Sequence, residues 1–591
     1  MRYVRSKLRD DYQTGFSSDL RLRVTLIVFV LLALLITARL VILMIFQHGF
    51  YVALASGSHD VYNNLFPKRG NVYIQDSRTG EEYPLAINRD HFLVYANTYE
   101  ITSDEMAEDV SEGLATVFHY DDDKKFSVYL QINKRDDPYE PLEKKVDEAV
   151  INQLQEKQLP GIGWKRQPFR YYPEGNLAAH VIGFVGKDEE GNDVGRYGIE
   201  GYWQKELAGS GGFFSGAKSA LGGKITLAGW NFKPAEDGAD ILLSIDRTLQ
   251  FQACEKLRQY TAEFKAQSAA LIIMDPNTGA IRAMCSLPDF DPNTYNQVES
   301  GDVYNNTTIF TPYEPGSVFK PVGMAAALNE EILTPDSTFY DTGSRAGLCQ
   351  KPIKNANGKV YETQTMTGVL ENSINTGMVF VAEQLGKKKF NEYVEKFGFG
   401  VKEGIQLDSE VSGDISTLQL KKGDDLDCYG ATASFGQGIT ATPLQLITAF
   451  SAIAKGGTLM KPYIIQEIRY SDGKVERFKP EEIRQVINKQ SAALLSGMLV
   501  NVVEGIHGKL AGVSGYYVAG KTGTAQIPGL GGYTDETIHS FIGYAPVDDP
   551  KFVMLIKFEK PQRTFSSATA APVFGKIANF ILQYYQVPPT R

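Results

Sequence analysis

The sequence of 591 residues is poor in cysteine and histidine and has no excess of positive charge. Its cysteines are too few and too widely separated for a Cys-x-x-Cys metal knuckle, and they leave the redox compartment open. Its seven histidines include no His-Glu-x-x-His pair, so a zinc peptidase is unsupported and no cofactor is expected. A net charge of −10 argues against nucleic-acid binding. The four cysteines are Cys254, Cys285, Cys349 and Cys428.

The remaining composition is that of an ordinary folded protein, with 43% hydrophobic and 22% charged residues. These values exclude a disordered chain, a collagen-like fibre and a small disulfide scaffold. A mean hydropathy of −0.22 excludes a polytopic membrane protein. The length predicts about three or four structural units.

One long hydrophobic run stands out against this average. Residues 24–46 contain a single charged side chain, Arg39. A helix of that length spans about 34 Å, enough to cross a hydrocarbon core of about 30 Å. The run therefore predicts a transmembrane anchor.

The charges beside the run predict its orientation. The first 23 residues hold six basic and three acidic side chains, whereas residues 47–66 hold no Lys or Arg. The positive-inside rule then makes residues 1–23 a cytoplasmic tail and puts the rest of the chain outside. A cleaved signal peptide, with residues 53–55 as its cleavage site, is the alternative. It is disfavoured because the run is longer than the apolar part of a signal peptide.

Two regions are expected beyond the anchor. Residues 47–235 are polar and turn-rich, with short strand-like segments at 71–74 and 91–95 that suggest no chemistry. From residue 241 the hydrophobic pattern indicates strands, helices and one hairpin. We expect strands at 241–245, 269–274, 280–285, 540–544 and 552–558, a helix at 248–264, and a final helix with apolar residues from Val573 to Tyr584. Residues 236–591 are therefore predicted to form an α/β-mixed domain whose sheet is closed by distant segments.

The first of three chemical motifs is Glu314-Pro-Gly-Ser317-Val-Phe-Lys320. Pro315 and Gly316 precede an apolar helical stretch, so Ser317 is expected near a helix N-terminus with Lys320 one turn later on the same face. A serine hydroxyl needs a base within hydrogen-bond reach to become a nucleophile. A lysine is such a base when burial or a nearby cation lowers its pKa.

Two further motifs follow along the chain. Ser373-Ile-Asn375 lies between apolar runs, where the hydroxyl is suited to relay a proton and the amide to bind a carbonyl; helix capping is the bland alternative. In Lys521-Thr522-Gly523-Thr524 a strand ends in small residues, so a ligand backbone can approach Gly523 closely. Lys521 and Thr522 there offer a cation and a hydroxyl to a carboxylate.

Each motif alone is weak, but the three in this order match the SxxK, SxN and KTG set of penicillin-recognising serine enzymes. With the anchor, the sequence resembles class B penicillin-binding proteins, the monofunctional peptidoglycan D,D-transpeptidases, and the septal, cell-division branch more than the elongation branch. The resemblance extends over segments 68–70, 170–183, 197–201, 435–445 and 540–546. It implies a mixed α+β elongated pedestal at 47–235, and then a serine β-lactamase-like domain with an antiparallel sheet flanked by helices.

The resemblance also implies residue roles. Ser317 attacks the D-Ala-D-Ala carbonyl, Lys320 takes its proton, and Ser373 passes a proton to the leaving D-alanine. Further roles belong to residues that hold the donor peptide. These are Asn375, which orients it, Lys521, Thr522 and Gly523 at its carboxylate end, and the backbone N–H groups of Ser317 and Thr524 as an oxyanion hole.

Three further features near the second and third motifs receive no catalytic role. The resemblance gives no role to the glycine-rich segment at 528–533, and His539 is interpreted as structural. The middle residue of the second motif, Ile374, replaces the Asp of many β-lactamases, which fits a transpeptidase.

The motifs leave other functions open. A D,D-carboxypeptidase or a β-lactamase carries the same set and deacylates with water, although a long pedestal favours cross-linking away from the membrane. A β-lactam sensor would be expected to carry more membrane spans. An assembly scaffold is compatible with catalysis, since the family usually works with a polytopic glycosyltransferase. Expected ligands are peptidoglycan stem peptides and, as covalent inhibitors, β-lactams.

Overall fold

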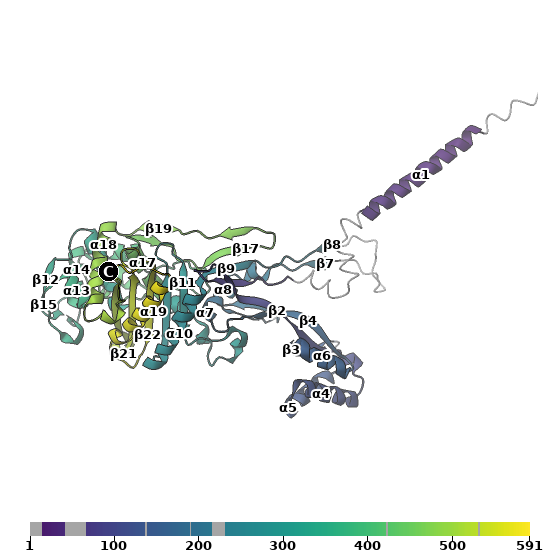
Figure 1. Cartoon of the computed structure of the whole chain (residues 1–591), viewed down its shortest axis with the longest axis horizontal. Coiled ribbons are helices and arrows are strands. Elements are labelled where there is room, and N and C mark those ends of the chain that lie inside the picture. Colours follow the sequence, from purple (N-terminus) through teal and green to yellow (C-terminus); the bar gives the residue numbers. More distant parts are fainter. Residues whose placement is uncertain are drawn as a thin grey trace, which may run out of the picture. The chain divides into compact units, whose positions relative to one another are not determined.

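The structure is a computed structural model that describes residues 15–41, 67–135, 139–189, 191–215, 231–420, 423–529 and 532–591 (Figure 1). It divides into two compact units. The first comprises residues 1–68 with 209–237, and the second comprises residues 69–208 with 238–591.

The first unit contains the predicted anchor. Helix α1 runs from Gly15 to Val41 and includes an apolar window, Val24–Val41, with a mean hydropathy of 2.7. It is the one helix in the described part of the chain that is long and apolar enough to cross a membrane. Residues 42–46 of the predicted span, residues 1–14 of the predicted tail and the alternative cleavage site lie outside the described residues. The unit also contains the antiparallel pair β7 (Phe213–Ser215) and β8 (Asn231–Lys233).

The second unit begins with a seven-stranded sheet ordered β18-β17-β9-β1-β2-β3, in which β4 also pairs with β2. Strand β9 is buried along almost its whole length, whereas β18 at the edge is exposed. Strand β1 pairs with β9 in parallel, while the other pairings are antiparallel. Segments far apart in sequence therefore share one sheet. Its strands are β1 (Val72–Gln75), β2 (Glu82–Ala96), β3 (Glu140–Val146), β4 (Ile162–Tyr171), β9 (Asp240–Asp246), β17 (Ile465–Arg469) and β18 (Val475–Arg477).

Three helices cover the part of this sheet made by β2, β3 and β4. They bury a separate small core that includes Val110, Leu114 and Leu154. Ser103 and Asp121 cap two of them through side-chain oxygens that accept backbone N–H groups, which is why those helices begin there. The helices are α4 (Asp104–Phe118), α5 (Asp122–Ile132) and α6 (Glu148–Lys157).

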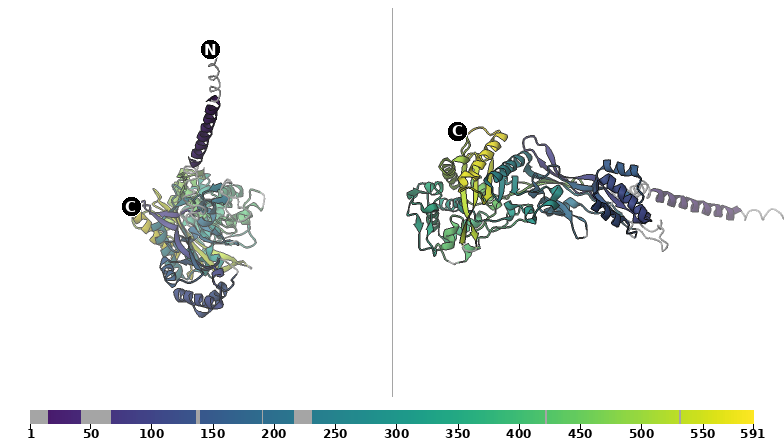
Figure 2. Two further views of the ribbon diagram at one scale, coloured as in Figure 1. Left: turned by 90° about the vertical axis from the view of Figure 1, so that its right-hand side faces the viewer. Right: turned by 90° about the horizontal axis from the view of Figure 1, so that it is seen from below.

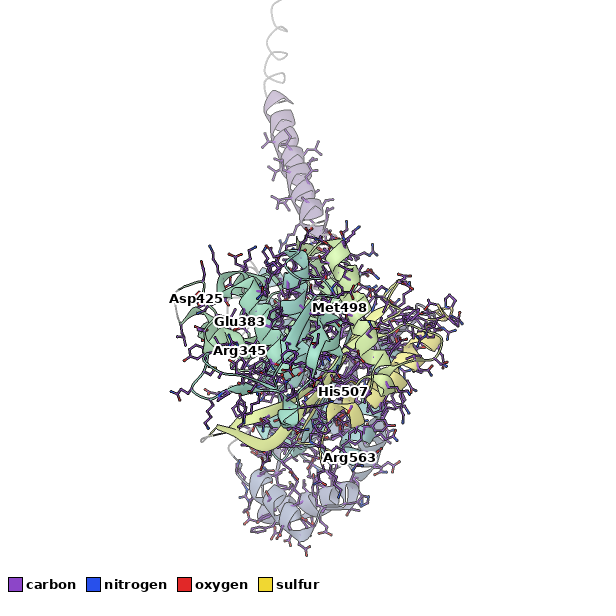
Figure 3. All side chains as sticks on the ribbon, turned by 90° about the vertical axis from the view of Figure 1, so that its left-hand side faces the viewer. Arg345, Glu383, Asp425, Met498, His507 and Arg563 are labelled. Atoms are coloured by element: carbon purple, nitrogen blue, oxygen red, sulfur yellow. A yellow bond between two sulfur atoms is a disulfide. The ribbon has the colours of Figure 1, made fainter. Side chains whose placement is uncertain are left out.

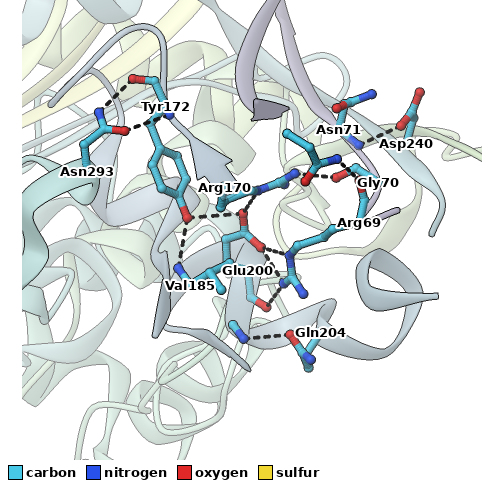
Figure 4. Close-up of polar contacts among 12 residues, drawn as sticks. Arg69, Gly70, Asn71, Arg170, Tyr172, Val185, Glu200, Gln204, Asp240 and Asn293 are labelled. Carbon is cyan, nitrogen blue, oxygen red and sulfur yellow. Dashed lines mark hydrogen bonds and ion pairs between the residues drawn. The ribbon is translucent and has the colours of Figure 1, made fainter. Parts of the chain in front are cut away.

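A buried carboxylate holds this region together (Figure 4). Glu200 has no exposed side-chain surface and forms ion pairs with Arg69 and with Arg170, whose Nε lies 2.6 Å from Glu200 Oε1. Tyr172 donates its hydroxyl to Glu200, and its backbone exchanges two hydrogen bonds with the Asn293 amide at 2.9 and 3.0 Å. Because Asn293 follows the first strands of the predicted catalytic domain, the cluster links that domain to the strands before it.

The second sheet has five antiparallel strands in the order β11-β10-β22-β21-β20. Alternate residues face two cores: Leu271 and Phe541 pack with α10 and α19, whereas Ile272 and Ile542 pack with α12, α17 and α18. Figure 2 shows α19 beside this sheet. The antiparallel sheet flanked by helices is thus confirmed. Its strands are β10 (Ser268–Met274), β11 (Ile281–Leu287), β20 (Ala519–Gly529), β21 (Gly532–Ala545) and β22 (Phe552–Glu559).

The helices that follow β9, in chain order, are α10 (Arg247–Phe264), α11 (Thr307–Phe310), α12 (Lys320–Asn329), α13 (Met366–Glu371), α14 (Asn375–Leu385), α15 (Lys387–Lys396), α16 (Cys428–Ala433), α17 (Pro443–Ala454), α18 (Lys489–Glu504) and α19 (Ala570–Tyr584). The unit also contains three short helices: α7 (Ala179–Ile182), α8 (Gly198–Tyr202) and α9 (Gln204–Ala208). Four antiparallel strand pairs are added by β5 (Phe184–Lys187) with β6 (Asp193–Arg196), β12 (Thr338–Asp341) with β15 (Glu362–Thr365), β13 (Ser344–Arg345) with β14 (Ile353–Lys354), and β16 (Thr458–Met460) with β19 (Glu482–Gln485).

All four cysteines are paired, which their spacing in the sequence did not reveal. Cys254 on α10 is bonded to Cys285 on β11, and Cys349 is bonded to Cys428 at the start of α16. The pairs lie 31 and 79 residues apart in the sequence. Such pairing is typical of proteins that fold in an oxidising compartment.

Candidate active site

Ser317 lies where a turn presses against the edge of the five-stranded sheet. It belongs to a short 3₁₀ helix, η5 (Gly316–Phe319), that leads directly into α12. Gly316 has φ +59° and its N–H donates to Gly436 O at 2.9 Å, while a Cβ at this position would lie 3.0 Å from the Cβ of Ala525 on β20. A glycine is needed there because both the backbone angle and the close contact disfavour a side chain. Ser317 itself is half-buried.

Lys320 opens α12 and its side chain is completely buried. Its Nζ donates to three oxygens of the second motif: the carbonyl of Ser373 at 2.6 Å, the hydroxyl of Ser373 at 3.1 Å and Oδ1 of Asn375 at 2.8 Å. The first two motifs, 53 residues apart at their nearest contact, therefore meet at this amine.

Ser373 and Asn375 lie at the junction of α13 and α14. Ser373 has φ +55°, a left-handed conformation that is unusual for a residue with a side chain and that commonly marks a functional site. Neither residue caps α14 through its side chain, so the alternative interpretation of this pair as helix-capping residues is wrong. The second amide atom of Asn375, Nδ2, donates to Lys354 O at 3.0 Å and so fixes which way the amide points.

The short strand pair that contacts Asn375 is itself hydrogen-bonded to α14. Its strands are β13 (Ser344–Arg345) and β14 (Ile353–Lys354), and Arg345 donates to Oε1 of Glu383 at 2.7 and 3.0 Å (Figure 3). Thr376 adds a buried hydrogen bond to Asp341 at 2.6 Å. These contacts orient Asn375 before any ligand binds.

Lys521 lies on β20, the edge strand of the sheet, and is also completely buried. Its Nζ contacts the hydroxyl of Ser373 at 3.1 Å and the carbonyl and hydroxyl of Thr522 at 3.2 and 3.4 Å. The outer edge of β20 has no partner strand among the described residues, and such an edge is suited to pairing with an extended ligand.

Both lysines have lowered pKa values. Burial, with the charge of Lys521 as a second cause, holds the pKa of Lys320 well below its usual value. Burial lowers the pKa of Lys521 to about 7. One of the two amines is thus readily neutral near neutral pH, which is the state that a base requires.

Gly523 and Thr524 complete the strand beside Ser317. A Cβ on Gly523 would lie 2.5 Å from Ser540 Oγ and 2.9 Å from a methyl group of Val318, so only glycine fits. Thr524 donates its hydroxyl to Ser566 Oγ at 3.2 Å and accepts the Ser566 N–H at the same distance. Its side chain is thereby engaged away from the serine.

His539 contributes to the structure around this strand. Both ring nitrogens contact hydroxyls, of Thr537 at 3.0 Å and Thr569 at 2.9 Å, and burial lowers its pKa to about 4. A buried, neutral histidine with both nitrogens engaged agrees with the structural interpretation. Glu314 received no role from the sequence, yet its carboxylate accepts hydrogen bonds from two other loops of the site.

Known proteins resemble both parts of the chain. Residues 269–579 match the family model described as the penicillin binding protein transpeptidase domain, and residues 64–243 match the penicillin-binding protein dimerisation domain. Stage V sporulation protein D of Bacillus subtilis is 31% identical over 97% of this chain and 86% of its own length. Peptidoglycan D,D-transpeptidase FtsI of Escherichia coli is 30% identical over 76% of this chain and 73% of its own.

A solved structure also shares the fold. Penicillin binding protein 3 from Mycobacterium tuberculosis, complexed with aztreonam, superposes with a TM-score of 0.66 at 25% identity. The match covers 89% of this chain and 98% of that one.

Proposed function

Because this chain belongs to the class B penicillin-binding protein family, we propose that it is a peptidoglycan D,D-transpeptidase that acts through an acyl-enzyme on Ser317. One observation carries the assignment of residues. Two buried lysines from separate motifs, Lys320 and Lys521, contact the same hydroxyl of Ser373, and Lys320 follows the half-buried Ser317 by three residues.

The acylation step follows from this arrangement. Neutral Lys320 takes the proton of the Ser317 hydroxyl as its oxygen attacks the carbonyl carbon of the D-Ala-D-Ala bond. The carbonyl oxygen becomes an oxyanion, stabilised by the backbone N–H groups of Ser317 and Thr524; one such donor is typically worth a few kcal/mol. The carbon–nitrogen bond then breaks, and Ser373 passes the proton from Lys320 to the leaving amine of D-alanine. The donor peptide remains as an ester of Ser317.

Deacylation reverses the proton path. The amine of a second stem peptide attacks the ester carbonyl, loses a proton to Lys320 through Ser373, and forms the new peptide bond as Ser317 Oγ leaves and is reprotonated. Asn375 orients the donor peptide, while Lys521, Thr522 and Gly523 receive its terminal carboxylate. A β-lactam presents the same carboxylate and carbonyl, so it acylates Ser317 as a covalent inhibitor.

The arrangement in the cell follows from the anchor. We propose that residues 24–46 cross the cytoplasmic membrane once, with residues 1–23 in the cytoplasm, a pedestal at 47–235 and the transpeptidase domain at 236–591 on the outer side. The two disulfides support this location, because they are rare in cytosolic proteins. The septal role, with a polytopic glycosyltransferase as partner, is preferred to an elongation role.

Covalent labelling tests the assignment of the nucleophile. The detergent-solubilised full chain is incubated with a fluorescent penicillin, and the intact mass reports one adduct per chain. The Ser317→Ala variant is expected to lose the adduct completely, whereas Ser77→Ala, a matched change at an exposed serine, keeps it. Full labelling of Ser317→Ala would refute the assignment. Rapid release of the label from the unaltered chain would instead favour a β-lactamase.

A further inference from the structure

The hairpin of β20 and β21 continues past the rest of its sheet. Strand β22 pairs with β21 only as far as Ile538, opposite Glu559, and Lys560 N–H then donates to Thr537 O at 2.9 Å. Apart from that bond, the backbones of the described residues 526–529 and 532–537 pair with each other. We call these residues the hairpin end. Most of its side chains are exposed, and its own hydrogen bonds include Thr534 Oγ1 to Ile527 O at 2.9 Å.

A single tyrosine connects the hairpin end to the loop of the nucleophile. The hydroxyl of Tyr533 donates to Oε2 of Glu314 at 2.9 Å. The other carboxylate oxygen, Oε1, accepts the backbone N–H of Gly438 at 3.0 Å. Glu314 precedes Ser317 by three residues, so one carboxylate joins the serine turn, the loop at Gly436–Gly438 and the hairpin end.

The same glutamate is partly withdrawn from water, and its two hydrogen bonds oppose the effect of burial on its pKa. It is half-buried, and burial raises the pKa of its carboxyl group above the usual value. Both of its oxygens accept from donors that lie on other elements of the fold. On the opposite side of the hairpin end, Lys560 and Glu536 form an ion pair at 2.9 Å that does not reach the serine turn.

The direction in which a donor peptide binds brings its earlier residues to the hairpin end. The donor carboxylate is received at Lys521 and Thr522, and the scissile carbonyl lies by Ser317 and Thr524. An extended peptide advances about 3.3 Å per residue, as does a strand. The donor residues two to four positions before the scissile bond therefore lie beside residues 526–528 of β20.

We propose that the Glu314–Tyr533 hydrogen bond determines specificity, because it fixes the hairpin end as the surface that binds the part of the donor stem peptide before D-Ala-D-Ala. This inference rests on the proposed function. Glu314 and Tyr533 act as positioning residues and take no part in proton transfer. Penicillin and short donors, which lack those stem residues, do not use this surface.

Donor length provides the test. For the full-length Tyr533→Phe variant, D-alanine release is measured with a pentapeptide stem and with an N-acetylated D-Ala-D-Ala dipeptide, together with the penicillin acylation rate. Loss of the hydrogen bond is expected to raise KM for the pentapeptide about threefold to tenfold, with kcat unchanged. Rates with the dipeptide and penicillin stay within about twofold. Glu314→Gln, which keeps one acceptor oxygen, is expected to show the same selective loss.

Tyr83→Phe is the matched control, because it removes the hydrogen bond from the Tyr83 hydroxyl to Glu81 at 2.7 Å, outside the hairpin end, and leaves Glu314–Tyr533 intact. It is expected to leave all three substrates unchanged. An equal fall with the long and the short donor in Tyr533→Phe would overturn the proposal, because it would indicate a distorted strand β20. No change with either donor would overturn it too. Failure of the proposed function is distinguishable, because the unaltered chain would then not be acylated by penicillin.

Discussion

Nζ of Lys320 and Nζ of Lys521 each lie 3.1 Å from the hydroxyl oxygen of Ser373. Two buried amines that share one small partner disfavour double protonation, because like charges repel strongly where water is excluded. The division of labour follows from this pairing. In the proposed mechanism the neutral amine takes the proton of Ser317, and the charged amine receives a carboxylate.

The pH dependence of acylation follows from the two lysines. Lys320 acts only when neutral, so the second-order rate constant with penicillin rises with pH through its lowered pKa. Lys521 binds the carboxylate only when charged, so the rate constant falls above a pKa of about 7. We expect a bell-shaped profile for the free enzyme, measured by stopped-flow labelling between pH 5 and 10.

In Lys521→Arg the guanidinium stays charged throughout this range, so the alkaline limb is expected to move upward by at least about one pH unit. Lys551→Arg, a matched change at a surface lysine, is expected to leave the profile unchanged. An alkaline limb that does not move in Lys521→Arg would assign that limb to another group.

The buried ion-pair cluster predicts a large loss of stability. Burial alone raises the pKa of Glu200, but Arg170 and Arg69 outweigh it and the pKa is lowered. Glu200→Gln leaves two largely buried guanidinium groups without a charged partner, a change that typically costs about 3–5 kcal/mol. We expect a clearly lower midpoint in thermal unfolding of the detergent-solubilised chain.

The pH dependence of this loss of stability provides a second measurement. Because folding lowers the pKa of Glu200, its contribution is fully present above the unfolded value and is lost as the pH falls through the folded value. The difference in Tm between the unaltered chain and Glu200→Gln should shrink in acid. Glu236→Gln, at an exposed ion pair, serves as control. A constant difference across pH would argue that packing, not charge, is responsible.

The two disulfides predict unequal losses of stability. Cys349–Cys428 closes a longer loop than Cys254–Cys285, 79 against 31 residues. In the chain-entropy account, the longer loop stabilises by about 1 kcal/mol more. Replacing both cysteines of each pair by serine is therefore expected to lower the urea midpoint more for the 349–428 pair. An equal or reversed order would show that strain or packing dominates.

The local part of the fold was predictable from the sequence. Hydrophobic runs predicted β9, the β10–β11 hairpin, β22 and α19 because each buries at least one continuous face, which leaves a clear period in the sequence. The three motifs likewise predicted a common site, and the structure brings Lys320, Asn375 and Lys521 together around Ser373.

The non-local part was not predictable. The parallel pairing of β1 with β9 and the insertion of β17 from residues 465–469 join segments with no local sign of their partners. The left-handed conformation of Ser373 and the choice of disulfide partners depend on the same long-range packing. The bond between Glu314 and Tyr533 spans 219 residues, so its two ends carry no common pattern.

The order of strands in the five-stranded sheet also affects how the protein folds during its synthesis. Ser268 on β10 pairs with Glu559 on β22, 291 residues later in the chain. At a synthesis rate of about 5–20 residues per second, β10 is made roughly 15–60 s before β22. Throughout this time one edge of the β10–β11 hairpin is open to pairing with another nascent chain, which is a recognised route to aggregation. A chain that ends before residue 552 contains every residue of the active site but lacks β22, the strand that joins the β10–β11 hairpin to the β20–β21 hairpin.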